Sequence, residues 1–184
     1  MVTWTNLTDG HSATGSVLSK SGDNWTADAT GTTTWNSGTL ATVEYTISNN
    51  SIDAFCGFDS ISNLDSYSMD YALYTGGSGS INIYENGSVV SSNVTSYTAS
   101  DTFKVNMATD GTVTYLKNDT VFYTSSTIAS GEYRVNAVMY TGGESITAEL
   151  LNPSSSSGGS GSSTAEEGSI TPDYILYLSS PPIK

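Results

Sequence analysis

The feature that most constrains the fold is a strict alternation of apolar and polar side chains, broken by short turns. In the stretch DTFKVNMATDGTVTYLKNDTVFYTS, residues 101–125, the first apolar side chains occupy every second position: Phe103, Val105 and Met107. Asp110-Gly111 and Asn118-Asp119 then offer tight turns between further alternating runs. Side chains at every second position of a strand share one face, so this stretch predicts three antiparallel strands.

The same period covers most of the chain, and no segment shows a sustained helical period. Expected strands are residues 2–7, 13–19, 39–48, 52–59, 66–75, 79–85, 88–91, 101–108, 112–117, 120–125, 132–141 and 144–151. Short strands with regular turn signals are typical of an all-β sandwich or barrel, and we predict two packed antiparallel sheets. The expected core is Val43, Tyr45, Phe55, Phe58, Tyr71, Ile83, Phe103, Val105, Val113, Tyr115, Val135 and Met139.

The charge balance excludes several partners. Five Lys plus Arg stand against eighteen Asp plus Glu, which gives a formal net charge of −13. Nucleic-acid binding depends on clustered cations, and so does attraction to an anionic membrane surface. No apolar run approaches the ~20 residues that span a bilayer. We therefore expect neither nucleic acid nor membrane as a partner.

The only cysteine, Cys56, lies between apolar residues in DAFCGF and is expected to be a small buried hydrophobe, with no intramolecular disulfide possible. The first residues, MVTWTNL, contain neither a basic region nor an apolar stretch of a signal peptide. If Met1 is the native start, a surface-type composition without an export signal suggests release by lysis, as in a phage particle. Trimming of a precursor would leave the same sequence.

The composition changes abruptly after residue 152. We predict a domain over residues 1–152, a Ser/Gly-rich linker over 153–168 and an apolar attachment segment over 169–184. The apolar run that would dock on a partner is Tyr174, Ile175, Leu176, Tyr177 and Leu178. The alternative is that this segment folds back as an extra strand of its own domain.

Two stretches carry a family resemblance: SYSMDYALYTGGSGSINIYENGSVV and the alternating run of residues 101–125. They resemble the concanavalin A-like jelly roll in the SPRY-like form found in phage tail and bacterial surface proteins. Ser100 stands where the family pattern has Gly before Asp101, and Asp119 replaces the Gly of a KNG turn. The resemblance implies a jelly roll over residues 2–151 and concerns strands and turns, not a site.

Catalytic patterns are missing from the sequence. The glucanases that share this architecture carry carboxylates in an E-x-D-x-x-E pattern, because acid and nucleophile must flank the scissile bond. The glutamates of the predicted domain never occur in that pattern. The single histidine, His11 in TDGHSAT, is in a turn setting and is expected to be an exposed loop residue. We predict a protein that is not an enzyme and needs no cofactor.

One polar loop offers hard oxygen ligands. FDSISNLDS contains Asp59, Asn63 and Asp65, which form a weak candidate site for Ca²⁺, a cation often held in the loops of such sandwiches. The spacing is not that of an EF-hand, and Asx turns in a polar loop explain the same residues. Six N-x-S/T sequons, at Asn6, Asn24, Asn49, Asn86, Asn93 and Asn118, are attributed mainly to turns.

The aromatic residues suggest a binding surface. Twelve Tyr and three Trp provide rigid amphipathic contact area, and several occupy strand positions opposite the expected core. The predicted ligand-binding residues are Trp25, Trp35, Tyr74 and Tyr84, with Tyr140 a further exposed candidate.

Two functions follow from these observations. The first is a virion structural protein, of the head-decoration or tail-fibre type, attached to capsid or tail proteins or to itself through its C-terminal segment. Surface glycans are a further candidate ligand of such a protein. The alternative is a free carbohydrate-binding or adhesin module of a secreted or surface protein. Both place the protein on a virion surface or outside the cell.

Overall fold

The computed structural model describes residues 1–25, 28–62 and 68–153, which form fourteen strands in two antiparallel sheets. Sheet A has the order β1 (Trp4–Thr5), β4 (Ala29–Asn36), β13 (Glu132–Met139), β6 (Ala54–Ser60), β7 (Tyr71–Gly76), β8 (Ser80–Glu85) and β9 (Ser88–Ser96). Sheet B has the order β12 (Thr120–Ile128), β11 (Thr112–Lys117), β10 (Phe103–Met107), β5 (Ala41–Ile47), β14 (Ser145–Leu151), β3 (Val17–Lys20) and β2 (His11–Thr14).

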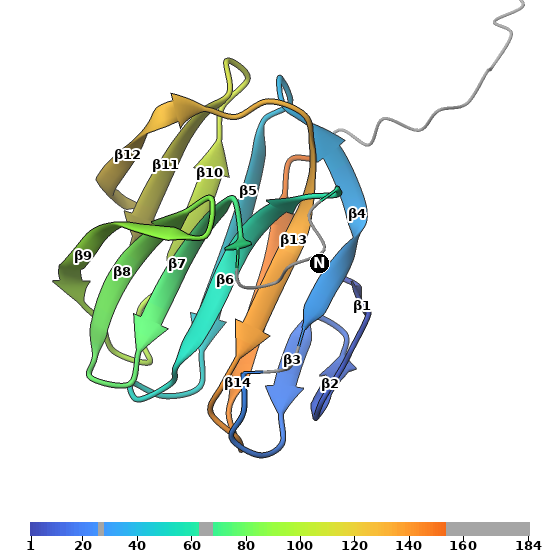
Figure 1. Ribbon diagram of the computed structural model, residues 1–184, viewed down its shortest axis with the longest axis vertical. Coiled ribbons are helices and arrows are strands. Elements are labelled where there is room, and N and C mark those ends of the chain that lie inside the picture. The colour runs from blue at the N-terminus through green and yellow to red at the C-terminus, as the bar shows by residue number, and fades with distance from the viewer. Residues whose placement is uncertain (26–27, 63–67, 154–184) are drawn as a thin grey trace, which may run out of the picture.

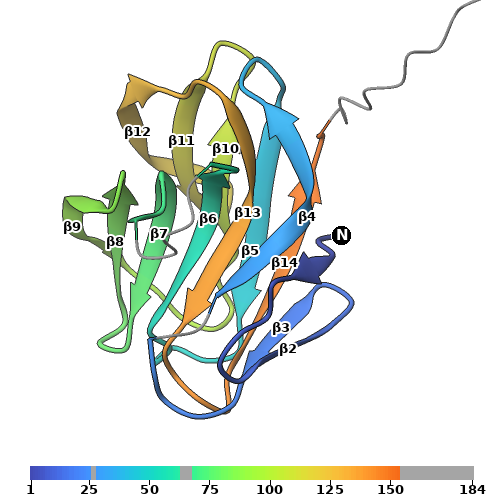
Figure 2. The ribbon, with the colours of Figure 1, turned by 45° about the vertical axis from the view of Figure 1, so that its right-hand side comes forward.

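The two sheets lie face to face (Figures 1 and 2). The described residues contain no α-helix. The predicted all-β jelly-roll sandwich is therefore confirmed. Helices long and apolar enough to cross a membrane are likewise not found in the part of the chain that the structure describes. The predicted linker and attachment segment lie outside the described residues from 154 onward.

The space between the sheets holds the main hydrophobic core. Eleven of the twelve predicted core residues lie in it, and Phe58, Phe103 and Tyr115 are among its largest fully buried side chains. Phe55 is the exception: it is buried, but in a second cluster on the outer face of sheet A. Strand β6 is apolar on both faces, so alternation did not reveal which side Phe55 would take.

Two elements differ from the sequence prediction. Strand β4 was not expected, because its sequence ATGTTTWN has almost no apolar alternation, yet it pairs with β1 on one side and β13 on the other. The expected strand 13–19 is two strands, β2 and β3, joined by a tight turn at Gly15-Ser16. Gly15 has a φ of 59°, a left-handed conformation that suits glycine in a turn.

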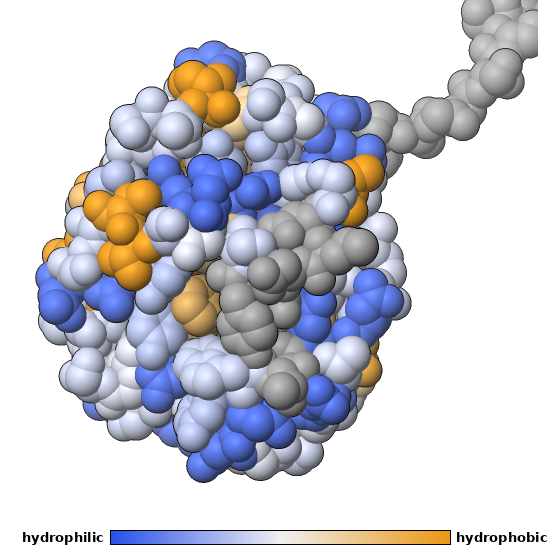
Figure 3. Space-filling view, in the orientation of Figure 1, coloured by the Kyte–Doolittle hydropathy of each residue, from blue (hydrophilic) through white to orange (hydrophobic). Residues whose placement is uncertain are grey.

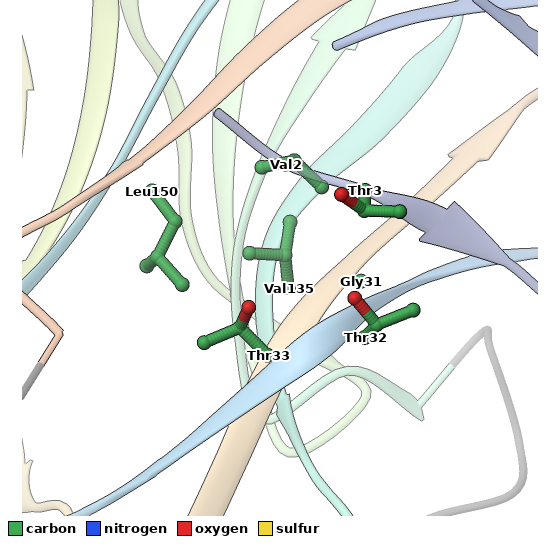
Figure 4. A pocket seen from close by; sticks show the side chains of 7 residues that line it. All are labelled: Val2, Thr3, Gly31, Thr32, Thr33, Val135 and Leu150. Carbon is green, nitrogen blue, oxygen red and sulfur yellow. The ribbon is translucent and has the colours of Figure 1, made fainter. Parts of the chain in front are cut away.

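Strand β4 approaches its neighbours closely. Figure 4 shows the seam between β1, β4, β13 and β14, where Val2 and Val135 lie next to Gly31 and Leu150 lines the opposite side. A Cβ on Gly31 would lie 3.2 Å from Cβ of Val135, so a larger residue would push the strands apart. The seam is too narrow for a water molecule and is not a ligand site.

Two single residues test the sequence reasoning further. Cys56 is buried and free, as expected, and burial raises the pKa of its thiol well above the usual range. His11, in contrast, is not an exposed loop residue: it lies in β2 and is only 8 % exposed. The turn signal Asp9-Gly10 ends one residue before it, and the strand that follows turns the imidazole inward.

Candidate functional site

Aromatic side chains gather on the outer face of sheet A. Along β6, Ala54, Cys56 and Phe58 point into the core, so Phe55 points outward. Around it lie the outward-facing aromatic residues Trp25, Tyr74, Tyr84 and Tyr140, which we call the aromatic face. The Phe55 ring lies 4.7 Å from that of Tyr74 and 4.8 Å from that of Tyr84, in tilted and edge-on arrangements. Such geometry adds to the stabilisation from burial alone.

Trp25 reaches this face because its loop is fixed at several points. The buried Lys20 ammonium donates to Oδ1 of Asn24 at 2.8 Å, and the Asn24 amide donates to the Tyr140 carbonyl at 3.2 Å. The Gly142 amide donates to Oδ1 of Asp23 at 2.7 Å. These bonds place the Trp25 ring 5.1 Å from that of Tyr140.

A carboxylate borders the aromatic face at the Tyr74 end. Asp53 accepts hydrogen bonds at Oδ1 from the Tyr74 hydroxyl, at 2.6 Å, and from the Gly77 amide, at 2.7 Å. Burial, reinforced by the Asp53 carboxylate, raises the pKa of Tyr74 far above its usual value. Tyr74 therefore stays protonated, and its ring is held in one orientation.

The other end of the same sheet face is polar and buried. Asp59 and Asn136 are 1 % and 2 % exposed, and Nδ2 of Asn136 donates to Oδ2 of Asp59 at 3.4 Å. Within the described residues Oδ1 of Asn136 has no hydrogen-bond partner. Burial raises the pKa of Asp28, an effect only partly offset by the Ala29 amide and the nearby charge of Arg134. Asp59 and Asn136 are therefore part of the interior of this end of the sheet and are not in contact with solvent.

Figure 3 views the molecule from the side of this face. Hydrophobic side chains form separate patches there, and most of the described surface is pale or hydrophilic. Trp25, Tyr74, Tyr84 and Tyr140 are each partly exposed, so their rings combine packing with contact to solvent. A surface of that kind can stack against a ligand that is itself amphipathic.

Three of the four predicted ligand-binding residues come together on this face: Trp25, Tyr74 and Tyr84. Their role in binding remains a prediction. Trp35 does not join them, which corrects the sequence prediction. It is 0 % exposed and packs edge-on against Phe58 at 5.7 Å in the core. Because β4 was not recognised, nothing in the sequence reasoning placed Trp35 on an inner face.

The metal candidates are only partly described. Asp59 lies in β6, where its Oδ1 accepts from the Asp70 amide at 3.2 Å, while Asn63 and Asp65 lie outside the described residues. The described part of the chain holds no cluster of three or more His, Cys, Asp or Glu residues able to bind a metal ion.

Comparisons with known proteins bear on the fold. No protein-family model matches the sequence, and no curated protein matches it significantly. Among solved structures, the TRIM65 PSpry domain matches with a TM-score of 0.62 at 11% identity, covering 80% of this chain and 88% of that one. The chain has the concanavalin A-like, SPRY-like fold.

Some of the solved structures with this fold are carbohydrate-recognising domains. The Emp47p carbohydrate recognition domain matches with a TM-score of 0.58 at 14% identity, over 82% of this chain and 88% of that one. The carbohydrate-binding module CBM66 from Bacillus subtilis matches with a TM-score of 0.53 at 14% identity, over 81% and 93%. At these identities the likeness establishes the architecture, and the ligand has to be argued from the residues.

Proposed function

We propose that this protein is a non-catalytic carbohydrate-binding module that holds a glycan on the aromatic face of sheet A. The observation that carries the proposal is the gathering of Trp25, Tyr74, Tyr84 and Tyr140, partly exposed, with the Asp53 carboxylate at the Tyr74 end. A sugar ring has apolar C–H faces and a rim of hydroxyls. Aromatic rings pack against the C–H faces, and a few fixed polar groups form hydrogen bonds with the hydroxyls and so orient the sugar.

The charge of the molecule favours a neutral glycan. With a formal net charge of −13, the protein would repel sulfated or carboxylated polymers at long range. The carboxylate beside the aromatic face, Asp53, accepts hydrogen bonds and can do the same for a sugar hydroxyl. Binding by stacking and neutral hydrogen bonds should depend little on salt.

Two of the similar structures support this proposal by analogy, since Emp47p and CBM66 are described as a carbohydrate recognition domain and a carbohydrate-binding module. The other expectation, a virion structural role with capsid or tail partners, gains no support from the structures named above. The attachment role of residues 169–184 is compatible with either setting, because a tethered glycan-binding domain can be part of a larger surface assembly.

The proposal is tested with a glycan array on the full chain, followed by calorimetry with the best neutral glycan. Trp25→Ala and Tyr84→Ala should each weaken binding by about tenfold, the loss of roughly 1–2 kcal/mol of stacking contact. Tyr123→Ala is the matched control, because Tyr123 is a partly exposed tyrosine of sheet B. An array without hits, or affinities that the two face variants leave unchanged, would contradict the proposal.

A further inference from the structure

A polar groove lies at the end of the sandwich where the chain passes from β12 in sheet B to β13 in sheet A (Figures 1 and 2). Its volume is about 310 Å³, at the small end of the range for ligand sites. The residues that shape it come from both sheets: Ser60, Asp70, Tyr71, Asn86, Thr127 and Tyr133. Tyr71 and Tyr133 belong to the inner faces of their strands, so this groove is separate from the aromatic face.

The walls of the groove consist of hydroxyl, amide and carboxylate groups. Asp70 accepts a hydrogen bond from the Ser60 amide at Oδ2, at 3.0 Å, and its side chain also interacts with that of Asp59. The Tyr71 hydroxyl lies 3.4 Å from Oγ1 of Thr127, a long contact that leaves both groups able to bond elsewhere. Among the described residues that line the groove there is no lysine or arginine.

Two tyrosine side chains line the groove, but their rings are packed in the core. The rings of Tyr71 and Tyr133 lie 6.1 Å apart at an interplanar angle of 62°, and both side chains are 4 % exposed. The Tyr133 hydroxyl donates to the Ser130 carbonyl at 3.0 Å and accepts from the Ser130 amide at 3.1 Å. These contacts fix the Tyr133 side chain, so this part of the groove lining is in place before any ligand binds.

A buried hydrogen-bond chain fixes the floor. Glu85 is 5 % exposed and accepts from the Tyr115 hydroxyl at 3.1 Å and from Oγ of Ser125 at 3.0 Å. Oγ of Ser125 lies 2.9 Å from Oγ1 of Thr127, and thereby links the buried carboxylate to the groove. The Glu85 carboxylate lies below the groove, and the Asp70 carboxylate lies in its wall. Together they create a negative potential that favours hydroxyl donors and disfavours anions.

We propose that this groove is a second subsite for carbohydrate, which takes one neutral, hydroxyl-rich sugar unit. The inference rests on the proposed glycan-binding function and adds to it a separate place of contact. Asp70, Asn86 and Thr127 offer both acceptors and donors to the hydroxyls of a sugar, and the exposed Ile128 side chain offers an apolar contact to its C–H face. The carboxylates of Asp70 and Glu85, with no cationic side chain among the described lining residues, disfavour an anionic sugar.

The test uses the full chain labelled with ¹⁵N and follows amide shifts during titration with millimolar glucose, galactose, mannose, N-acetylglucosamine, glucuronate or choline. At least one neutral sugar should shift the amides of Asn86, Thr127 and Ser130, and glucuronate should not. Tyr71→Phe and Asp70→Asn should each weaken that sugar about five- to tenfold, the effect of losing one hydrogen bond. Tyr123→Phe, which alters a tyrosine outside the groove, should leave the affinity unchanged.

The outcomes separate this inference from the proposed function. Shifts confined to the Trp25 indole and Tyr84 would leave the aromatic face as the glycan site and overturn the groove subsite. Shifts confined to the groove, lost in Tyr71→Phe at an unchanged melting temperature, would support the subsite and contradict binding at the aromatic face. Shifts at the groove with choline alone would overturn the assignment of a neutral sugar, and no shifts with any probe would overturn the subsite.

Discussion

At the scale of single residues, burial decides which aromatic side chains support the fold. Phe103 is 0 % exposed, and its ring lies 5.2 Å from Tyr45 and 6.0 Å from Tyr97. Phe103→Ala should therefore lower the free energy of unfolding by ~3–5 kcal/mol, because it removes a large side chain from a site that cannot collapse. Chemical denaturation measures this, with Val121→Ala at a 51 % exposed position as control. A loss below ~1 kcal/mol would mean that Phe103 does not lie on the inner face of β10.

His11 gives the fold a dependence on pH. Burial lowers the pKa of His11, the charge of the neighbouring Lys20 acts in the same direction, and the Asp28 backbone offsets part of the effect. The unfolded chain therefore binds a proton more readily, so stability should fall as the pH drops below ~6.5, the unfolded-state pKa. In His11→Leu the melting temperature should decline less between about pH 7.5 and 5 than in the wild type. An identical decline in both would contradict this role of His11. Asp28 and Asp70 cannot replace it as the cause, because burial raises their pKa values, so they bind protons more readily in the folded state and favour folding as the pH falls.

The residues also show how far sequence reasoning reaches. Alternation identified eleven core positions, most of them in strands with one clear apolar face. It could not place Phe55, whose strand is apolar on both faces, nor Trp35, whose strand is mostly threonine. The site was foreseen in part: aromatic residues in the opposite phase to the core do gather, whereas the groove joins residues far apart in sequence, such as Asp70 and Thr127. Only the fold brings those together.

At the scale of elements, the strands with regular alternation were predicted within a few residues, and the failures have physical causes. Strand β4 is a threonine-rich strand between β1 and β13, and its stability comes from neighbours far along the chain. The turns were easier to predict from the sequence. A positive φ is found at four of the six sequon asparagines, which supports the attribution of most sequons to turn chemistry: Asn6, Asn86, Asn93 and Asn118.

The β11–β12 turn offers a test of backbone strain. Asn118 and Asp119 have φ values of 50° and 64°, and Oδ1 of Asp119 lies 2.6 Å from the Lys104 ammonium. Asp119→Gly and Asp119→Ala lose the same exposed ion pair, but only glycine adopts this φ without strain. The glycine variant should therefore be the more stable of the two by ~1 kcal/mol in thermal unfolding. Equal stabilities would indicate that the turn relaxes to another conformation.

At the scale of the whole molecule, the two sides of the sandwich differ. One side ends in the short strands β1 and β2, and the other in β9 and β12, which are nine residues each and contain no charged residue. Val89, Val90, Val121 and Ile128 are exposed there, and hydrophobic groups appear over this side in Figure 3. Long uncharged edge strands can pair with a further strand, so this side is where an added segment would dock.

The last prediction concerns residues 165–184, which lie outside the described structure. In sheet B the edge strand β12 is four strands from β14, about 19 Å away, and a Ser/Gly-rich chain of residues 154–169 spans roughly 20 Å on average. The apolar run 174–178 can therefore reach the edge of its own domain as well as that of a neighbour.

We expect docking on a neighbour: deleting residues 165–184 should leave the melting temperature unchanged and abolish self-association measured by light scattering. Leu176→Asp in the full chain keeps the length but adds a charge to the apolar run. It should likewise abolish self-association and leave the melting temperature unchanged. A melting temperature several degrees lower, with association intact, would show instead that the segment belongs to its own sandwich.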